Sequence, residues 1–343
     1  MKIGQFGEPF SSYGRFAGLV ALLCLTLTGC LTFSQEQTPQ AGIKSACSRY
    51  KLTPLPLKPA AINDSGVVAG TSEAYRAALW SSRKGLQEIP LPAGYTRSAA
   101  VGLNRRGVLL GLATNIKENQ RAAFTFVHGK VTMLPGSQSR AYAINDDGAI
   151  AGEAILQGHA TNAAVLWKHG TGIDVTNTCC GGVAVSVNNR LQVVGNVYNA
   201  EGHYEAFLWE EKHGFERIGA PGSFSSALAI NNAGHVLIES FSQGILFYQD
   251  GKLTPLTLST KFPNHPRGLT DSDVVIGSFG PFADADRAFR WDSQHGLCDL
   301  NDGIPSGTHW KLRAASGINR KGEIVGWGDY KGEEGVGFLL TPE

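Results

Sequence analysis

The stretch AINDDGAIAG, residues 143–152, contains the pattern that decides the fold. It consists of a small residue, an apolar residue, Asn, two polar residues and Gly, followed by apolar residues and a second Gly. Asn and Asp side chains bond to nearby backbone groups, and Gly adopts positive φ without steric cost, so both favour tight turns. Alternating apolar residues are typical of strands. The pattern therefore predicts a strand, a turn that starts at Asn145 and a second strand.

The same pattern recurs, with seven copies at intervals of 39 to 49 residues. We call its third residue the anchor; it is Asn in six copies and Thr270 in the other. The residue two places before the anchor is small in every copy, which suits a crowded position where innermost strands converge. The copies are AINDSGVVAG (61–70), GLNRRGVLLG (102–111), AINDDGAIAG (143–152), SVNNRLQVVG (186–195), AINNAGHVLI (229–238), GLTDSDVVIG (268–277) and GINRKGEIVG (317–326).

The chain between two copies contains two further strand-like segments. The first ends in a large residue, as in NAAVLW (162–167), and the second follows a short turn with Gly, as in GIDVTN (172–177). One unit therefore has four strands, named A, B, C and D in chain order, with the anchor at the end of strand A. Leu191, Ile238 and Thr270 depart from the pattern and leave the turn type in units four to six open. Aromatic residues that recur in strand C are expected in the core between units: Trp80, Trp167, Trp209 and Trp291.

The two ends of the chain complement each other. The last unit ends GVGFLLTPE (335–343) without a strand D, whereas KLTPLPL (51–57) precedes the first unit and matches the D segment KLTPLTL (252–258) at six of seven positions. Pairing them would close a ring and leave no edge exposed. Four-stranded units of about 40 to 50 residues are typical of β-propellers. We therefore predict an all-β, seven-bladed β-propeller over residues 47–343, closed by pairing of an N-terminal strand with the C-terminal blade. A β-solenoid and a double sandwich are the alternatives.

The repeats resemble those of the bacterial HAF family of extracellular repeat proteins. The resemblance is carried by the AINDSGVVAG and AINDDGAIAG copies, by AFLW (206–209), and by LNDGIPSGTHWKLRAASGINRKGEIVG (300–326) followed by GFLLTP (337–342). It covers roughly residues 50–342. The resemblance implies an exported, propeller-like protein, and it implies no activity, because the family has no general catalytic motif to carry over.

The N-terminus has the features of an export signal. Lys2 and Arg15 precede an apolar run at residues 16–27, which has the length of a signal-peptide core and is too short to span a membrane. The following Leu27-Thr28-Gly29-Cys30 resembles a lipoprotein lipobox. The resemblance implies cleavage between Gly29 and Cys30, acylation of Cys30 and anchoring in the bilayer; a plain secretory signal is the alternative. Residues 30–46 are polar and suit a flexible tether. In lipoproteins, a residue other than Asp after the Cys favours the outer membrane of a Gram-negative cell, and Leu31 meets this condition. Either side of that membrane is compatible with the sequence.

Four cysteines remain in the exported part, and the sequence allows three connectivities among them. Cys47 lies just before the closing strand and Cys298 in strand D of unit six, so a Cys47–Cys298 disulfide would lock the ring in an oxidising compartment. Cys179 and Cys180 would then be free or form a vicinal disulfide. A metal or redox site is the runner-up, and the absence of CxxC spacing argues against it.

Composition and motifs narrow the classes of function. The chain has 343 residues, 42% hydrophobic and 17% charged, with 43 glycines and a formal net charge of +1. This near-neutral charge gives no electrostatic reason for binding nucleic acid. The sequence contains no GxSxG, HExxH, GxxxxGK[ST] or strand-linked GxGxxG motif. We therefore expect no cofactor and no bound metal, and an enzyme is the less favoured class.

The candidate binding residues lie in the B–C and D–A loops. If strand A is innermost, these loops share one face of the ring around its central channel. Propellers usually bind their ligands or partners on this face. The longest insertion, residues 301–313, places His309 and Trp310 there as contact residues, although Trp310 could instead pack its own loop down. His159 and His203 occupy similar loops of adjacent units. They could be a pair of metal ligands or two histidines exposed to solvent. The full set is His159, Tyr198, His203, His309, Trp310, Asp329 and Tyr330.

Three functions are compatible with these residues. The first is a membrane-anchored, non-catalytic module that binds another protein of the cell envelope. The second is a propeller that binds a small ligand or a glycan through aromatic residues at the channel mouth. The third is an enzyme whose site is assembled from several units, which no linear motif would reveal; the fold alone does not imply one. The sequence names neither the partner nor the ligand.

Overall fold

The computed structural model describes residues 47–176, 181–199, 201–219, 224–256, 258, 263–281 and 286–343. The predicted signal peptide, the lipidation site Cys30, the tether up to residue 46 and the pair Cys179 and Cys180 lie outside these ranges. Within them, no helix has the length and apolar character needed to cross a membrane.

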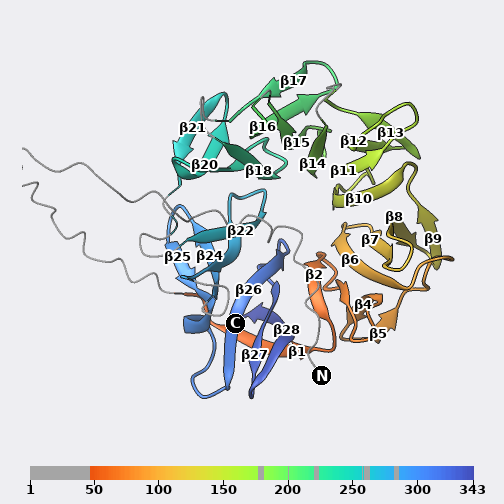
Figure 1. The fold of residues 1–343 in the computed structure, drawn as a ribbon. Coiled ribbons are helices and arrows are strands. Elements are labelled where there is room, and N and C mark those ends of the chain that lie inside the picture. The colour runs from red at the N-terminus through yellow and green to blue at the C-terminus, as the bar shows by residue number, and fades with distance from the viewer. Residues whose placement is uncertain are drawn as a thin grey trace, which may run out of the picture. The chain divides into compact units, whose positions relative to one another are not determined.

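The described residues form seven four-stranded antiparallel sheets arranged as the blades of a ring (Figure 1). Blades one to three contain β2 (Lys58–Ile62), β3 (Val68–Thr71), β4 (Ala77–Ser81) and β5 (Gly85–Glu88); β6 (Arg97–Leu103), β7 (Leu109–Asn115), β8 (Gln120–Val127) and β9 (Lys130–Met133); and β10 (Ser137–Ile144), β11 (Ile150–Ile155), β12 (Ala163–Lys168) and β13 (Thr171–Asp174).

Blades four and five contain β14 (Gly182–Val187), β15 (Val193–Tyr198), β16 (Tyr204–Glu210) and β17 (Gly214–Arg217); and β18 (Ser225–Ile230), β19 (Val236–Ser240), β20 (Gly244–Gln249) and β21 (Lys252–Pro255). Blade six contains β22 (Asn264–Leu269), β23 (Val275–Phe279), β24 (Arg287–Asp292) and β25 (Gly296–Asp299), followed by the 3-10 helix η2 (Leu300–Gly303). Blade seven contains β26 (Trp310–Ile318), β27 (Ile324–Tyr330), β28 (Glu333–Pro342) and β1 (Tyr50–Leu55).

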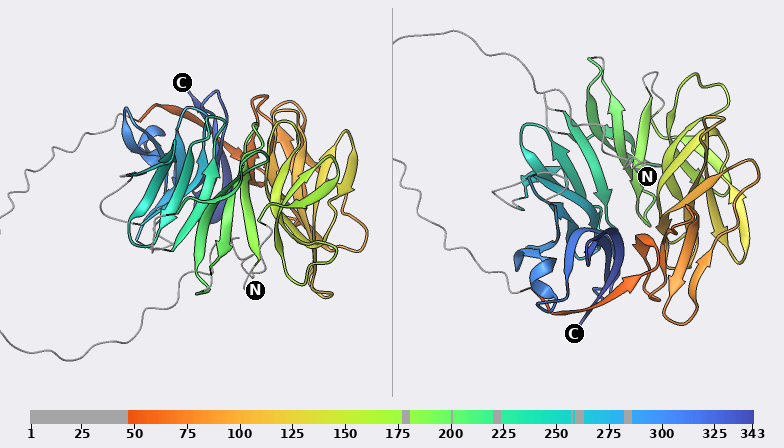
Figure 2. Two further views of the ribbon diagram at one scale, coloured as in Figure 1. Left: turned by 90° about the horizontal axis from the view of Figure 1, so that it is seen from above. Right: turned by 60° about the horizontal axis from the view of Figure 1, so that its bottom comes forward.

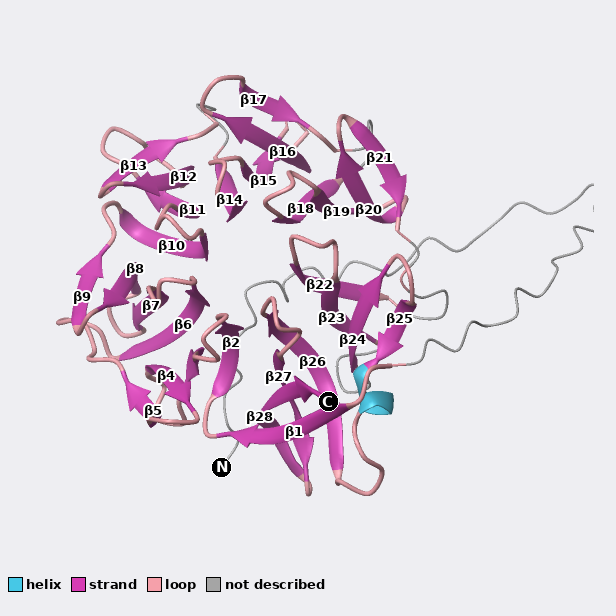
Figure 3. Ribbon diagram, turned by 180° about the vertical axis from the view of Figure 1, so that it is seen from behind, coloured by secondary structure: helices cyan, strands magenta, loops and turns pink. Residues whose placement is uncertain are grey.

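The N-terminal strand closes the ring, as the sequence predicts. β1 pairs antiparallel with β28, with Tyr50 opposite Pro342 and Leu55 opposite Gly337. Figure 3 shows β1 lying along the outer side of the last blade. A disulfide joins Cys47, just before β1, to Cys298 in β25 of the neighbouring blade. The last blade is therefore held by a strand from the other end of the sequence and by a covalent bond across the blade boundary.

The anchor turns have one geometry in all seven blades. In each, the anchor N–H donates to the carbonyl four residues later, and its carbonyl accepts from the N–H three residues later. The third residue after the anchor has positive φ in every blade, including the non-glycine Leu191 (φ 60°) and Asp273 (φ 59°). The departures at these blades therefore leave the turn type unchanged.

The anchor asparagines also join neighbouring blades, a role that the turn chemistry alone did not predict. The Asn104 Nδ2 donates to the Asn145 carbonyl at 3.0 Å, and Asn145 donates to the Asn188 carbonyl at 2.9 Å. The same bond runs from Asn319 in blade seven to Asn63 in blade one at 3.0 Å. Six such bonds connect the described anchors; Thr270, which has no amide, does not donate to the next blade. The six anchor asparagines are buried, so each bond replaces water.

Apolar side chains fill every contact between neighbouring blades. Seven clusters of buried residues are found in the described chain, one at each of these contacts. In four blades the repeated glycine of strand B lies opposite a phenylalanine of strand C, as in Gly111 with Phe124, and a Cβ at Gly111 would come within 2.3 Å of that ring. In blade five, Ile238 faces the smaller Leu246 instead. The smaller partner leaves room for the Ile238 side chain.

Candidate binding face

Strand A is innermost in every blade, which fixes where the loops lie. Each first strand contacts the first strands of both neighbouring blades, and Figure 1 shows them around the centre of the ring. Because the strands are antiparallel, the anchor turns and C–D turns lie on one side, the turn face. The B–C and D–A loops lie on the opposite side, the loop face. Figure 2 shows the ring from the side, with loops projecting beyond the strands at both ends.

The turn face uses its polar groups to hold blades together. A small hollow of about 190 Å³ in its centre is lined by anchors and by the residues that follow them, such as Asp146 and Asn189. The Asp146 carboxylate accepts hydrogen bonds from Asn189 Nδ2 at 2.8 Å and from Arg105 Nε at 2.6 Å. Burial alone would raise the pKa of Asp146, but these bonds outweigh it and hold the pKa below its usual value. The polar side chains of the turn face therefore serve to join neighbouring blades.

A cluster of aromatic side chains lies on the loop face at the end of the contact between blades four and five. We call Tyr198, His203, Tyr204, Phe224 and Phe241 the open cluster. Tyr198 and Tyr204 stack with ring centroids 4.3 Å apart, and their hydroxyls lie 2.6 Å apart. The His203 ring lies 3.9 Å from Phe224, and Phe224 meets Phe241 edge-on at 6.1 Å.

The open cluster is exposed to an unusual degree for large apolar rings. Phe241 is 87% exposed, Phe224 46% and Tyr198 39%. In β15 and β16, Val194 and Ala206 face blade five, and side chains two residues apart point to the same side of a strand. Tyr198 and Tyr204 therefore continue the core between blades four and five out to the surface. Phe224 and Phe241 join them from blade five. The sequence predicted Tyr198 and His203 here, and it missed Tyr204 and both phenylalanines.

The rings of a second aromatic cluster on the loop face pack against one another and against residues of the same blade. Trp310 stacks on Tyr330 at 4.7 Å and meets Phe338 edge-on at 6.2 Å, and the Lys331 Nζ lies 5.1 Å from the centre of the Tyr330 ring. We call Trp310, Tyr330 and Phe338 the closed cluster. Trp310 is half-buried against the core of blades six and seven, so it holds its loop down. Of the predicted pair, His309 is the exposed member, and it has φ of 58°.

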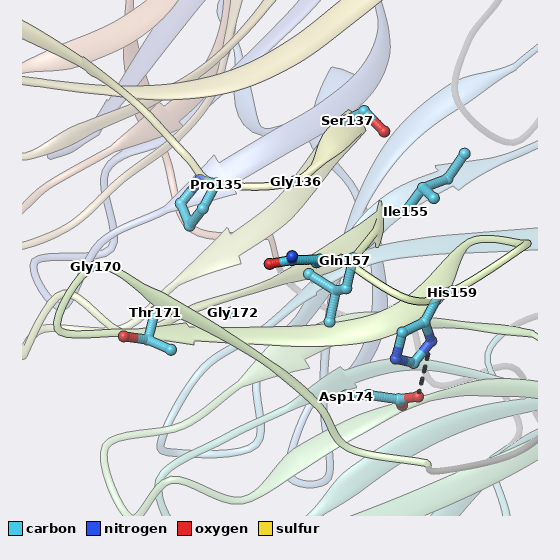
Figure 4. A pocket seen from close by; sticks show the side chains of 11 residues that line it. Pro135, Gly136, Ser137, Ile155, Gln157, His159, Gly170, Thr171, Gly172 and Asp174 are labelled. Carbon is cyan, nitrogen blue, oxygen red and sulfur yellow. Dashed lines mark ion pairs between the residues drawn. The ribbon is translucent and has the colours of Figure 1, made fainter.

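The remaining predicted residues have partners within their own blades. Asp329 accepts two hydrogen bonds from Arg313, at 2.8 and 2.5 Å. His159 Nδ1 lies 3.8 Å from the Asp174 carboxylate, and Figure 4 shows the two side chains directed at each other. They border an open pocket of about 780 Å³ in blade three, which extends past Pro135 and Ile155 to Gly170. Asp174 also accepts from the backbone N–H and hydroxyl of Thr176, both at 2.9 Å.

The two candidate metal ligands are not brought together as a site. His159 faces Asp174, whereas His203 packs on Phe224. In the ranges that the structure covers, no three His, Cys, Asp or Glu side chains are placed to hold a metal ion. Asp286, also on the loop face, has its pKa raised by burial, offset in part by nearby His265 and by a 3.4 Å hydrogen bond from Ser278.

Comparisons with known proteins identify the fold. No family model matches the chain, and no curated protein matches it. Among solved structures, it is similar to the β-propeller domain of the Trilobed protease from Pyrococcus furiosus, with a TM-score of 0.60, 10% identity and coverage of 85% of this chain and 97% of that one. That domain is described as having an open velcro topology, whereas β1 pairs with β28 here.

Two further solved structures are similar to this chain; one is a β-propeller domain, and the other is described as bound to a peptide. The WD40 β-propeller domain of Doa1 has a TM-score of 0.55 at 12% identity, with 87% of this chain and 98% of that one covered. YCF48 bound to D1 peptide has a TM-score of 0.54 at 12% identity, with 87% and 97% covered. At these identities the likeness shows the fold alone.

Proposed function

We propose that this chain is an exported, lipid-anchored β-propeller of the HAF type, which serves as a non-catalytic protein-interaction module in the cell envelope. The lipobox ending at Cys30 and the preceding apolar run support the anchor and the export. Several acyl chains on one cysteine hold a protein stably at a membrane, whereas a single chain is marginal. The tether over residues 30–46 would let the ring present its loop face to a neighbouring protein of the envelope.

The observation that carries the proposal is the open cluster. Large exposed aromatic rings on a rigid frame are typical of protein-binding surfaces, where aromatic residues supply most of the binding energy. Phe241 is 87% exposed, while the rings of the closed cluster are half-buried or buried. The fold is compatible with peptide binding, since the similar YCF48 structure is described as bound to a peptide.

Cross-linking in cells tests this function. We expect the wild-type chain to cross-link to a discrete envelope protein, and Phe241→Ser to lose that product. Ile116→Ser is the matched control, because Ile116 is 64% exposed in the B–C loop of blade two, on the same face. Cys30→Ala tests the contribution of the anchor. The proposal fails if no envelope protein is captured, or if both serine variants capture it equally.

Small-ligand or glycan binding is a second candidate, favoured by the open pocket of blade three. Its lining mixes apolar Ile155 with His159 and Gln157, a combination that suits a partly polar ligand. A glycan array probed with the wild-type protein and with His159→Ala tests it. Signals lost in the variant would support this second role, and a blank array would count against it.

A further inference from the structure

Aromatic rings in other blades are covered by cations of the same chain. Lys58 lies 4.6 Å above Trp327, Arg97 lies 4.5 Å above Tyr75, and Lys331 lies 5.1 Å from Tyr330. The ring face is electronegative and attracts a cation, by about 0.5–1 kcal/mol at exposed sites. Among the described residues, no lysine or arginine makes such a contact with Phe241 or Tyr198.

The sequence around the open cluster explains why. Residues 191–209 and 218–251 contain no lysine and no arginine, and they carry Glu201, Glu205 and Glu239. Glu201 and Glu239 are exposed. Arg217, the cation of β17, is paired with Glu205 through Nε and Oε2 at 2.5 Å. Glu205 pairs with Val197 and Glu239 with Ile245, so these two carboxylates face blades three and six, whereas Glu201 lies in the B–C loop between Tyr198 and Tyr204. In the described residues 191–199, 201–209 and 224–251, the surface around the open cluster therefore combines exposed aromatic rings with the Glu201 carboxylate and has no lysine or arginine.

We propose that the open cluster is the docking surface for a positively charged peptide segment of a partner protein, in which lysine or arginine alternates with apolar side chains. This rests on the proposed function and specifies the chemistry of the partner. An arginine would stack on the tyrosine pair and approach the carboxylate of Glu201, while an apolar side chain would cover Phe241. Charge complementarity would steer encounter and select this partner over acidic ones.

The same charges disfavour two other macromolecules. Anionic lipid headgroups and nucleic-acid phosphates are held by clusters of lysine and arginine. The described B–C loop of blade four carries Glu201 and has no lysine or arginine. A basic protein segment is therefore the occupant that fits this surface.

A peptide-binding assay with full-length protein in detergent tests the proposal. The probes are three synthetic nine-residue peptides: one alternates arginine and leucine, one has glutamine in place of arginine, and one has glutamate. We expect the arginine peptide to bind, the other two to bind at least about tenfold more weakly, and the binding to weaken as salt rises. Phe241→Ser should lower the affinity for the arginine peptide about tenfold, and Glu201→Gln should lower it less, whereas Ile116→Ser should leave it unchanged.

Several outcomes would overturn the inference. Equal binding of the three peptides, or equal binding by Phe241→Ser and wild type, would do so. If sedimentation shows a dimer of the wild-type chain and a monomer of Phe241→Ser, the occupant of the open cluster is a second copy of the chain instead. A thermal melt of each variant shows that the fold is retained. If Phe241 is needed for the cross-link in cells but no arginine peptide binds, the proposed function stands and the partner chemistry is wrong.

Discussion

The two aromatic clusters of the loop face differ in what covers them. In the closed cluster, Trp310 stacks on Tyr330, and Lys331 lies over that ring. In the open cluster, Tyr198 also stacks on its cross-strand neighbour Tyr204, but Phe241 projects into solvent. Similar side chains at the same end of two blades thus serve different purposes. The chain packs the rings of the closed cluster, whereas Phe241 of the open cluster stays 87% exposed, and this difference is the basis of the proposed binding site.

The largest effect should come from the disulfide beside the closed cluster. Cys47 and Cys298 belong to the same core as Trp310. Cys298→Ser should lower the free energy of unfolding by about 4 kcal/mol, because the bond closes a long loop of chain. Urea unfolding measures this loss. Peptide binding by the open cluster should persist at low urea, and its loss would show that the two clusters are coupled.

Truncating one ring in each cluster tests the comparison directly. Trp310→Ala should lower the free energy of unfolding by about 3 kcal/mol, since it removes a packed ring. Phe241→Ala should change it by less than about 0.5 kcal/mol, because an exposed side chain contributes little. Urea unfolding of both variants provides the measurement. Similar losses would mean that the open cluster is part of the core.

A smaller effect is expected from the ring of anchors, which lies on the turn face, opposite both clusters. Thr270→Asn would supply the missing amide toward the anchor of blade seven and should stabilise the protein by about 1 kcal/mol. Asn145→Thr removes the amide that bonds to the Asn188 carbonyl and should cost about 1–2 kcal/mol. Thermal melts compare the pair. If Thr270→Asn is no more stable than wild type, the blade contact there has no room for the bond.

The smallest effect comes from exchanging the cations. Lys331→Gln uncovers Tyr330 and should cost about 0.5 kcal/mol of stability. Gln243→Lys places a lysine two residues after Phe241, where it would compete with the cation of a partner. It should weaken arginine-peptide binding severalfold without destabilising the protein. Unchanged binding in a titration would argue against a role for cations at the open cluster.

The sequence was sufficient for the ring and less so for the surface. The seven anchors and the D-like segment at residues 51–57 predict seven blades and their closure, because a repeat reports local structure and its count. The bond from each anchor to the next blade could not be read from one copy, since its acceptor lies about 40 residues away. The turn at Leu191 also keeps its geometry without glycine, because the neighbouring hydrogen bonds impose it.

The positions of the open-cluster residues were predicted in part. Tyr198 and His203 lie at the end of a repeated strand and in the loop after it, so their face could be inferred from the blade pattern. Phe224 and Phe241 lie just before β18 and just after β19 of blade five, where the Phe241 N–H donates to the Phe224 carbonyl at 3.0 Å. The blade pattern does not specify their side chains, and the contact of Phe224 with His203 joins them to blade four. Trp310 seemed exposed because it lies beside a long insertion, yet Tyr330, twenty residues later, stacks on it.

Photo-cross-linking from single positions tests the central claim most directly. A photoreactive phenylalanine analogue replaces Phe241 in one strain and Ile116 in another, and each is irradiated in living cells. A discrete protein adduct at position 241, absent at position 116, is the result that the open cluster predicts. No adduct at position 241, or the same adduct from both positions, would contradict the claim that this cluster is the binding surface.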